Sequence, residues 1–234
     1  MTTIANTQTV SGTEAATTTP NLQKLGGWSG IIAGSTWIFG FAMFVTVFAP
    51  LISGELDAAE TVAFIGENQT MFYIWNLVIY VLFGVVQAVL TLAIHERLKD
   101  SAPALSQIAA ALGLIWSALV IGSGMVANIG AATVIQMYTA DPEQAGIVWM
   151  AIDAVGRGIG GGNEIVGGLW VVLLSWAAMR GGLPKSLNIA GMIFGAAGIV
   201  TLVPMLTDVG ALFGLGLIAW YIWAGIVLLT PRQS

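Results

Sequence analysis

Long apolar segments, each of at least the length that crosses a lipid bilayer as a helix, recur along the whole chain. A helix needs roughly 20 apolar residues to cross the hydrocarbon core of a membrane. Backbone polar groups must be paired within lipid, so such segments fold into helices that pack on one another. The sequence therefore predicts an all-α, polytopic integral membrane protein, a bundle of six transmembrane helices. The segments cover residues 29–52, 72–94, 105–138, 142–179, 187–205 and 209–229.

The composition agrees with a membrane protein and excludes several kinds of site. Of the 234 residues, 57% are apolar and 8% charged, and the mean hydropathy is +0.88, whereas soluble domains carry about 25% charged residues. The chain has no cysteine and one histidine, His95, which excludes disulfides, thiolate metal sites and any site with two histidines from one chain. The net charge of −5 argues against a nucleic-acid partner. No residue pattern identifies a cofactor.

The charged residues between the segments predict the orientation. With six spans, the linkers that carry Lys24, Arg97, Lys99, Arg180, Lys185 and Arg232 share one side. The opposite side receives the acids Glu55, Asp57, Glu60, Glu67, Asp141, Glu143 and Asp208. By the positive-inside rule both termini are expected in the cytoplasm, in a multi-pass protein of the inner (plasma) membrane.

The chain is predicted to have one folded unit and a tail. Residues 1–25 are expected to be a disordered cytoplasmic tail, because residues 1–23 are rich in Thr and Ala and lack the basic start and apolar run of a signal peptide. Residues 26–234 are expected to form a single transmembrane domain.

Two of the segments are longer than a membrane crossing requires. Residues 105–138 and 142–179 would form helices of about 50–57 Å, against a hydrocarbon core of about 30 Å. We expect the two helices to project outward as a hairpin, with strong tilt as the alternative. Asp141 and Pro142 are a typical start signal for the second of them. The outer loop, residues 54–70, contains a short amphipathic helix that either lies in the interface plane or caps the mouth of the bundle.

The best candidate for a site lies between Asp153 and Glu164. In one unbroken helix, Asp153, Arg157, Gly160 and Glu164 would share a face, and Asp153 and Arg157 would pair. One interpretation is a polar pocket that opens outward; the other is an ion pair that docks the hairpin onto the outer loop. The glycines within residues 158–162 indicate either a broken helix that lines a site or close packing of a neighbouring helix.

Two asparagines on neighbouring helices are the expected partners of Glu164. A carboxylate at membrane depth is costly without a polar partner, and Asn76 and Asn128 are polar groups of the second and third segments. Hydrogen bonds that hold a bundle together are the alternative role for both. No catalytic residue and no metal ligand is predicted. The candidate ligand-binding residues are Asp153, Arg157, Asn163, Glu164, Asn76 and Asn128.

The turn between the fourth and fifth segments carries a resemblance. Arg180 ends one helix, Leu183, Pro184 and Lys185 form the turn, and Gly191 and Gly198 follow in a glycine-rich helix. This stretch resembles an uncharacterised family of bacterial six-span membrane proteins, a domain of unknown function, and the layout agrees over residues 26–229. The resemblance implies a six-helix bundle in a bacterial inner membrane. It supplies no activity and no catalytic residue.

Two classes of function stay open. The first is a non-enzymatic protein that binds partners or lipids, as a subunit or accessory protein of a membrane complex; its partners would be the lipid bilayer and other membrane subunits or a second copy of the chain. The alternative is a small transporter or receptor with an outward-facing polar cavity around Arg157 and Glu164. An enzyme ranks third, because no nucleophile–base set is visible. A closed bundle would favour the first class, and a cavity that reaches Glu164 would favour the second.

Overall fold

The computed structural model describes residues 19–161 and 164–230, which fold into helices joined by turns. Two helices are interrupted by π-helical segments, η1 (Leu77–Leu82) and η2 (Arg157–Gly161), and a 3-10 segment, η3 (Pro204–Val209), precedes the last helix. The α-helices are α1 (Thr19–Val45), α2 (Pro50–Ser53), α3 (Ala58–Glu67), α4 (Gln69–Asn76), α5 (Phe83–Leu98), α6 (Pro103–Tyr138), α7 (Pro142–Gly156), α8 (Ile165–Ala178), α9 (Lys185–Val200) and α10 (Gly210–Leu229).

Five helical stretches are long and apolar enough to cross a membrane, so the chain is a helical membrane protein. They are Leu22–Val45, Gln69–Leu98, Pro103–Tyr138, Pro142–Ala178, which includes the two undescribed residues 162 and 163, and Gly210–Leu229. The helix expected over residues 187–205 is shorter: α9 has 16 residues, about 24 Å. It ends before Pro204, which has no N–H to continue the hydrogen-bond ladder of an α-helix.

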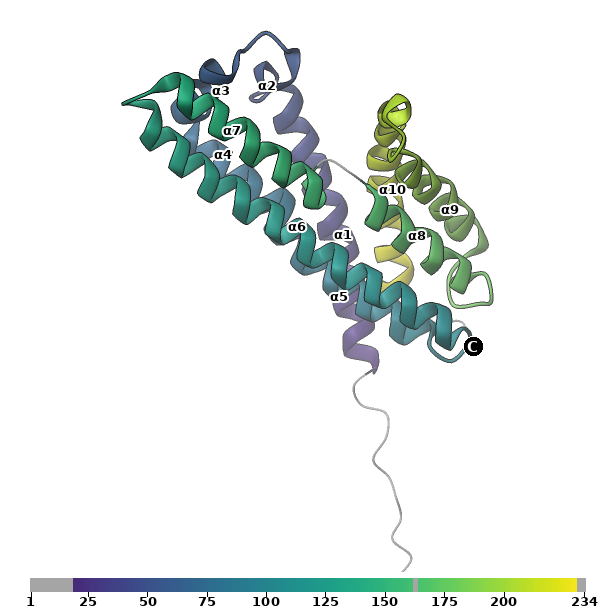
Figure 1. Ribbon diagram of the computed structural model, residues 1–234. Coiled ribbons are helices and arrows are strands. Elements are labelled where there is room, and N and C mark those ends of the chain that lie inside the picture. The colour runs from purple at the N-terminus through teal and green to yellow at the C-terminus, as the bar shows by residue number, and fades with distance from the viewer. Residues whose placement is uncertain (1–18, 162–163, 231–234) are drawn as a thin grey trace, which may run out of the picture.

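The long helix α6 connects two groups of helices (Figure 1). Toward its N-terminal end it packs against α5 and α8, and α1, α9 and α10 complete that group. Toward its C-terminal end it packs against α7, α3 and α4. Figure 1 shows α6 and α7 extending side by side away from α8, α9 and α10. The two predicted long segments therefore do form an extended hairpin, whose second helix is interrupted after α7.

Each group has its own hydrophobic core. The large core surrounds the N-terminal half of α6, and its largest fully buried side chains include Trp116, Trp170 and Tyr221. The small core lies at the far end of α6, where Phe48, Phe72 and the α3 side chains meet α7. Bulky side chains fill both cores, and helix α6 contributes to each of them.

Short-range signals set the ends of several helices. Asp57 begins α3 with a reciprocal cap: its carboxylate accepts from the Glu60 N–H, and its own N–H donates to the Glu60 carboxylate, both at 2.8 Å. Asp141 caps α7 through one hydrogen bond, its carboxylate accepting from the Gln144 N–H at 3.0 Å, with Pro142 in the first turn. Helix α7 thus begins at the start signal that the sequence predicts, and α3 lies within the outer loop where a short amphipathic helix is expected.

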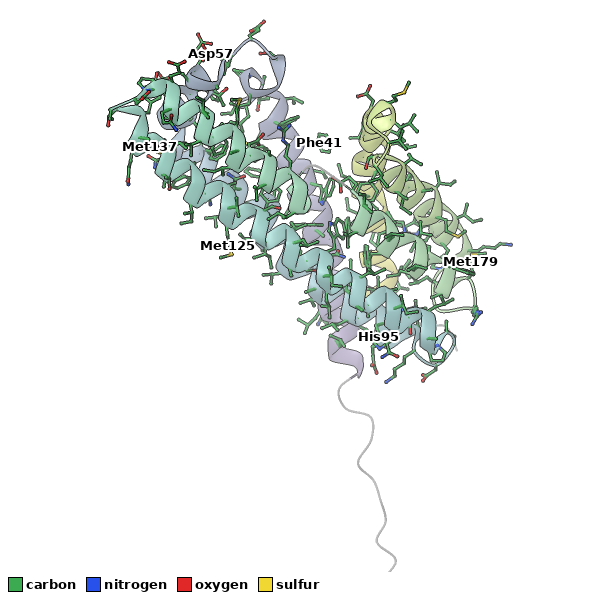
Figure 2. The ribbon with its side chains drawn as sticks, viewed as in Figure 1. Phe41, Asp57, His95, Met125, Met137 and Met179 are labelled. Atoms are coloured by element: carbon green, nitrogen blue, oxygen red, sulfur yellow. The ribbon has the colours of Figure 1, made fainter. Side chains whose placement is uncertain are left out.

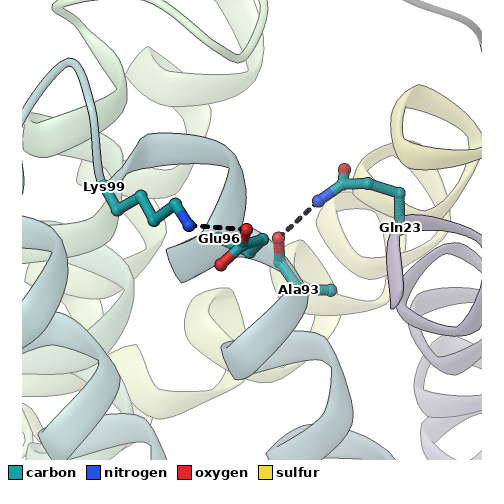
Figure 3. A network of polar contacts seen from close by, with 4 residues as sticks. All are labelled: Gln23, Ala93, Glu96 and Lys99. Atoms are coloured by element: carbon teal, nitrogen blue, oxygen red, sulfur yellow. Dashed lines mark hydrogen bonds and ion pairs between the residues drawn. The ribbon is translucent and has the colours of Figure 1, made fainter. Parts of the chain in front are cut away.

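The polar end of the bundle ties three segments together. The Arg97 guanidinium donates to the Gly182 carbonyl at 2.7 Å and to the Gln23 side chain at 3.3 Å. Figure 3 shows Gln23 of α1 donating to the Ala93 carbonyl at 2.7 Å. The start of α1, the end of α5 and the turn between α8 and α9 therefore share one end of the molecule. That turn requires glycine, because Gly181 and Gly182 have φ angles of 126° and 100°.

A surface ion pair completes this end. Lys99 and Glu96 are 2.7 Å apart (Figure 3), and the hydrogen bond to Glu96 raises the pKa of the Lys99 amine. The segments that carry Lys24, Arg97, Lys99, Arg180 and Lys185 thus meet at one end of the described chain, whereas Arg232 lies outside the described residues.

The predicted boundary of the tail needs correction. Helix α1 begins at Thr19, so residues 19–25 belong to the fold, whereas residues 1–18 lie outside the described part of the chain. Pro20 suits the first turn of a helix, and Leu22 packs against the large core. Tertiary contacts therefore extend the helix beyond the apolar segment that sequence patterning detects.

Candidate ligand-binding site

Two helices lose their regular α-helical form close to the centre of the molecule. The helix that begins as α4 continues into α5 through the π-helical segment η1. The chain that begins as α7 is interrupted by η2, and regular helix resumes at Ile165. Irregular backbone at membrane depth is tolerated where it is buried in protein or lines a cavity, and π-helical turns frequently mark functional sites.

Gly160 makes the interruption of α7 and α8 possible. Its φ of 156° and ψ of 0° lie in a region that side chains with a Cβ rarely adopt. A Cβ at this position would also lie 3.3 Å from the carbonyl carbon of Leu119 on α6. The sequence allows two interpretations of the glycine run, a broken helix and close packing of a neighbour. Both apply at Gly160, where the helix is interrupted and the backbone lies close to α6.

A cavity of about 300 Å³ lies beside this interruption and is called the inner cavity below. Of the described residues that line it, Glu164 alone carries a charge. Figure 2 shows Phe41, one of the lining residues, on α1 between the two groups of helices, well away from His95 at the polar end. The aromatic side chains of its wall are Trp37, Phe41, Phe44, Trp75, Tyr80, Phe83 and Trp116.

Contacts between rings hold the aromatic wall in place. Trp37 meets Phe83 edge to face, with ring centroids 5.7 Å apart, and Phe83 meets Trp116 in the same manner at 5.5 Å. Phe44 and Trp75 stack with centroids 6.1 Å apart. Aromatic pairs favour these offset and edge-to-face arrangements, so contacts among its own side chains hold the wall in place.

The Glu164 carboxylate faces this wall without a protein partner among the described residues. The residue is partly buried, and its backbone carbonyl accepts from the Gly168 N–H at 2.7 Å. Within residues 19–161 and 164–230, no hydrogen bond or ion pair is recorded for its side chain. The nearby Thr36 hydroxyl, which lines the same cavity, donates to the Ala33 carbonyl at 2.8 Å.

A second cavity of about 510 Å³, called the outer cavity below, adjoins the first. The two share Phe44, Trp75 and Tyr80 as lining residues. The Asp153–Arg157 ion pair lies in its wall, with Oδ2 and Nη2 2.7 Å apart and the side chains 39% and 66% exposed. The predicted pairing of these two residues is therefore present.

The predicted asparagine contact with Glu164 is not found among the described residues. The Asn76 side chain donates instead to the side-chain oxygen Oδ1 of Asn128 at 3.1 Å, and the Asn128 side-chain amide donates to the Tyr73 backbone carbonyl at 3.4 Å. Asn76 precedes Tyr80 by four residues, roughly 6 Å along a helix, and it is Tyr80 that lines the cavity beside Glu164. The asparagines thus hold α4 to α6, the alternative role that the sequence allowed.

The other predicted site residues divide between the two cavities. Asp153, Arg157 and Asn76 line the outer cavity, Glu164 lines the inner cavity, and Asn163 lies outside the described residues. The expected continuous stripe from Asp153 to Glu164 is broken, because the helix itself is broken between them.

The aromatic wall was missed by sequence reasoning. Its clearest signal is on α1, where Trp37, Phe41 and Phe44 recur at spacings of four and three residues and so share one helix face. Such a stripe is common on helices that pack into a core, and its meaning depends on what lies opposite. Only the fold places Glu164 there.

Comparison with known proteins identifies a family without an assigned activity. The sequence profile of a domain of unknown function (DUF4386) matches residues 26–230. No curated protein and no solved structure matches the chain.

Proposed function

The chain belongs to the DUF4386 family, a domain of unknown function, and from this premise we propose that it is a non-enzymatic membrane protein that binds a small organic ligand in the inner cavity, as a receptor or transporter does. The observation that carries the proposal is a cavity that reaches Glu164 between the two hydrophobic cores. A closed bundle would have favoured a purely structural subunit instead.

The shape and chemistry of the cavity support this function. Ligand sites in proteins are concave, mostly apolar, and contain a small number of polar groups that orient the ligand. The inner cavity has an aromatic wall, one carboxylate and a volume of about 300 Å³, at the lower end of the usual range for such sites. Interrupted helices beside a central cavity are also a recurring feature of transporters.

The finer topology is part of the proposal. We propose six spans, with the short helix α9 as the fifth, and both termini in the cytoplasm of a bacterial inner membrane. The grouping of Arg97, Gln23 and Gly182 at one end supports an even number of crossings, and the positive-inside rule assigns that end to the cytoplasm. Reporter fusions after Lys99 and Lys185 should read cytoplasmic, and one at Asp141 should read external.

Native mass spectrometry of the protein released from mild detergent tests the function directly. The wild-type protein is expected to retain a small molecule. In Ile79→Trp a larger side chain occupies the cavity, since Ile79 belongs to its lining, and the retained mass should be lost. Leu77→Trp is the matched control, because Leu77 lies on the same π-helical segment but is 49% exposed.

The outcomes separate ligand binding from a structural role. Loss of the bound mass in Ile79→Trp alone, with both variants folded by thermal unfolding, supports the proposed function. Equal retention in all three proteins would assign the bound molecule to another surface. A wild-type protein that retains no small molecule, and that no compound of a chemically varied library stabilises against thermal unfolding, would overturn the proposal.

A further inference from the structure

We propose that the ligand of the inner cavity is a hydrophobic organic cation, such as a substituted ammonium compound, which pairs with Glu164 while its apolar body lies against the aromatic wall. This inference rests on the proposed function and adds the chemical class of the ligand. It follows from which charges and rings the fold brings together.

The first step is the charge of the cavity. Glu164 is the one charged group among the described lining residues, and no lysine or arginine of the described chain lines the same space. A carboxylate in apolar surroundings is costly unless an opposite charge or several hydrogen bonds compensate it. A ligand that supplies the missing positive charge relieves this cost, whereas an anionic ligand would add to it.

The second step is the aromatic part of the lining. Trp37 and Phe41 on α1 and Trp75 on α4 line the cavity together with Glu164, and the faces of aromatic rings attract cations through their quadrupoles. Aromatic side chains that surround a cation are the usual means by which proteins recognise quaternary ammonium groups. A carboxylate and an aromatic cage together are thus selective for charge and tolerant of apolar bulk.

The third step is the charge of the approach. The outer cavity contains Asp57, Asp153 and Arg157 as its charged residues, and Arg157 and Asp153 are paired at 2.7 Å. The sum of these three formal charges is −1, the same sign as Glu164. A cation therefore meets an attractive field along both cavities, and focused fields of this kind raise local ligand concentration.

Three aryl compounds of similar size test the charge class. Phenyltrimethylammonium is the cation, tert-butylbenzene replaces its nitrogen with carbon and is neutral, and benzenesulfonate is the anion. Binding is measured by calorimetry on the protein in phosphatidylglycerol nanodiscs, with empty nanodiscs as the blank. The wild-type protein should bind the cation at least about 10-fold more tightly than the neutral analogue, and the anion most weakly.

A neutral isostere of the carboxylate tests the residue. Glu164→Gln should weaken binding of phenyltrimethylammonium about 30-fold or more, as expected when one partner of a buried charge pair is removed. Its affinity for tert-butylbenzene should stay within about 3-fold of wild type, which also shows that the variant is folded and the cavity intact. Glu67→Gln is the matched control: Glu67 ends α3, is exposed and lines neither cavity.

Each outcome bears on a different claim. Equal affinity for cation and neutral compound, or a preference for the anion, would overturn the charge class and leave ligand binding in place. Loss of all binding in every compound, together with no retained mass in native spectra, would overturn the proposed function itself.

The lipid composition of the nanodiscs distinguishes two sources of the natural cation, a lipid headgroup and a free small molecule. If nanodiscs that contain phosphatidylethanolamine compete with phenyltrimethylammonium, the natural ligand is a lipid headgroup. If they do not, it is a free cation; both results keep the charge class.

Discussion

The two cavities differ in how their charges are compensated. In the outer cavity Asp153 and Arg157 neutralise one another, and Asn76 and Asn128 share a hydrogen bond beside it. In the inner cavity the Glu164 carboxylate faces aromatic rings and has no recorded partner among the described residues. Polar groups that satisfy one another hold a structure together, whereas a charge left uncompensated in apolar surroundings implies a partner that arrives from outside. This difference is why we propose the inner cavity as the ligand site and the outer cavity as its approach.

The largest expected effect comes from a side chain at Gly160, where the helix is interrupted beside the inner cavity. Gly160→Val should lower the free energy of unfolding by about 3 kcal/mol, because it forces an unfavourable φ and crowds the backbone of α6. Gly156→Val is the control, since no atom lies within 4 Å of a Cβ there, and it should change stability by about 0.5 kcal/mol or less. Thermal unfolding in detergent measures both. Equal stability of the two variants would mean that neither the φ angle of Gly160 nor its closeness to α6 requires glycine at this position.

Removing the charge of the inner cavity should stabilise the ligand-free protein. Glu164→Gln keeps the shape of the side chain and removes a charge that no described residue pairs with, so the free energy of unfolding should rise by about 1–2 kcal/mol. Glu67→Gln, in an exposed position, should leave it within about 0.5 kcal/mol. A loss of about 1–2 kcal/mol in Glu164→Gln would contradict the difference drawn between the two cavities, because it would reveal a protein partner that holds the Glu164 carboxylate in place.

Breaking the asparagine pair should have a moderate and opposite effect. Asn76→Leu leaves the Asn128 side-chain oxygen without its donor and should lower stability by about 1 kcal/mol. The double substitution of Asn76 and Asn128 by leucine should cost less than the sum of the single substitutions, because the pair is lost only once. Additive losses in this cycle of unfolding measurements would argue that the two amides are not coupled.

The smallest effect is expected at the ion pair of the outer cavity. Asp153→Asn should lower stability by about 0.5 kcal/mol, since Asp153 and Arg157 are 39% and 66% exposed and exposed pairs contribute little. High salt screens such pairs, so the difference from wild type should disappear in unfolding scans at 1 M salt. A salt-independent loss of several kcal/mol would place this pair in a much drier environment than its exposure indicates.

Local signals made most of the fold predictable. The apolar length of the segments, the start signal at Asp141 and Pro142, and the four-residue spacing of Asp153 and Arg157 all act within one or two helical turns, and the structure contains each of them. Gly30 and Gly34 are a local signal of the same kind, because small residues four apart allow helices to approach closely, and a Cβ on either would collide with α10. Such features need little knowledge of tertiary arrangement.

The site needed tertiary information. The π-helical segment η1 has no local sequence signal, yet it helps to decide that Tyr80 lines the inner cavity while Asn76 reaches Asn128. The angle at which α8 leaves the interruption sets what Glu164 faces, and that angle depends on the packing of α8 against α6 and α9. Residue types alone therefore identified Glu164 as unusual but paired it with the wrong neighbours.

The π-helical segment has a consequence for how the chain can change in length. A π-helical turn holds more residues than an α-helical turn, so η1 acts as an insertion that the bundle has accommodated. Deleting one residue within Leu77–Leu82 would restore a regular helix and rotate Trp75 and Asn76 by about 100° relative to α5. Trp75 would leave the cavity wall and Asn76 would lose Asn128. Substitutions along this segment should thus be tolerated far more easily than a change in its number of residues. In an alignment of this family, we expect the segment to vary in sequence but not in length.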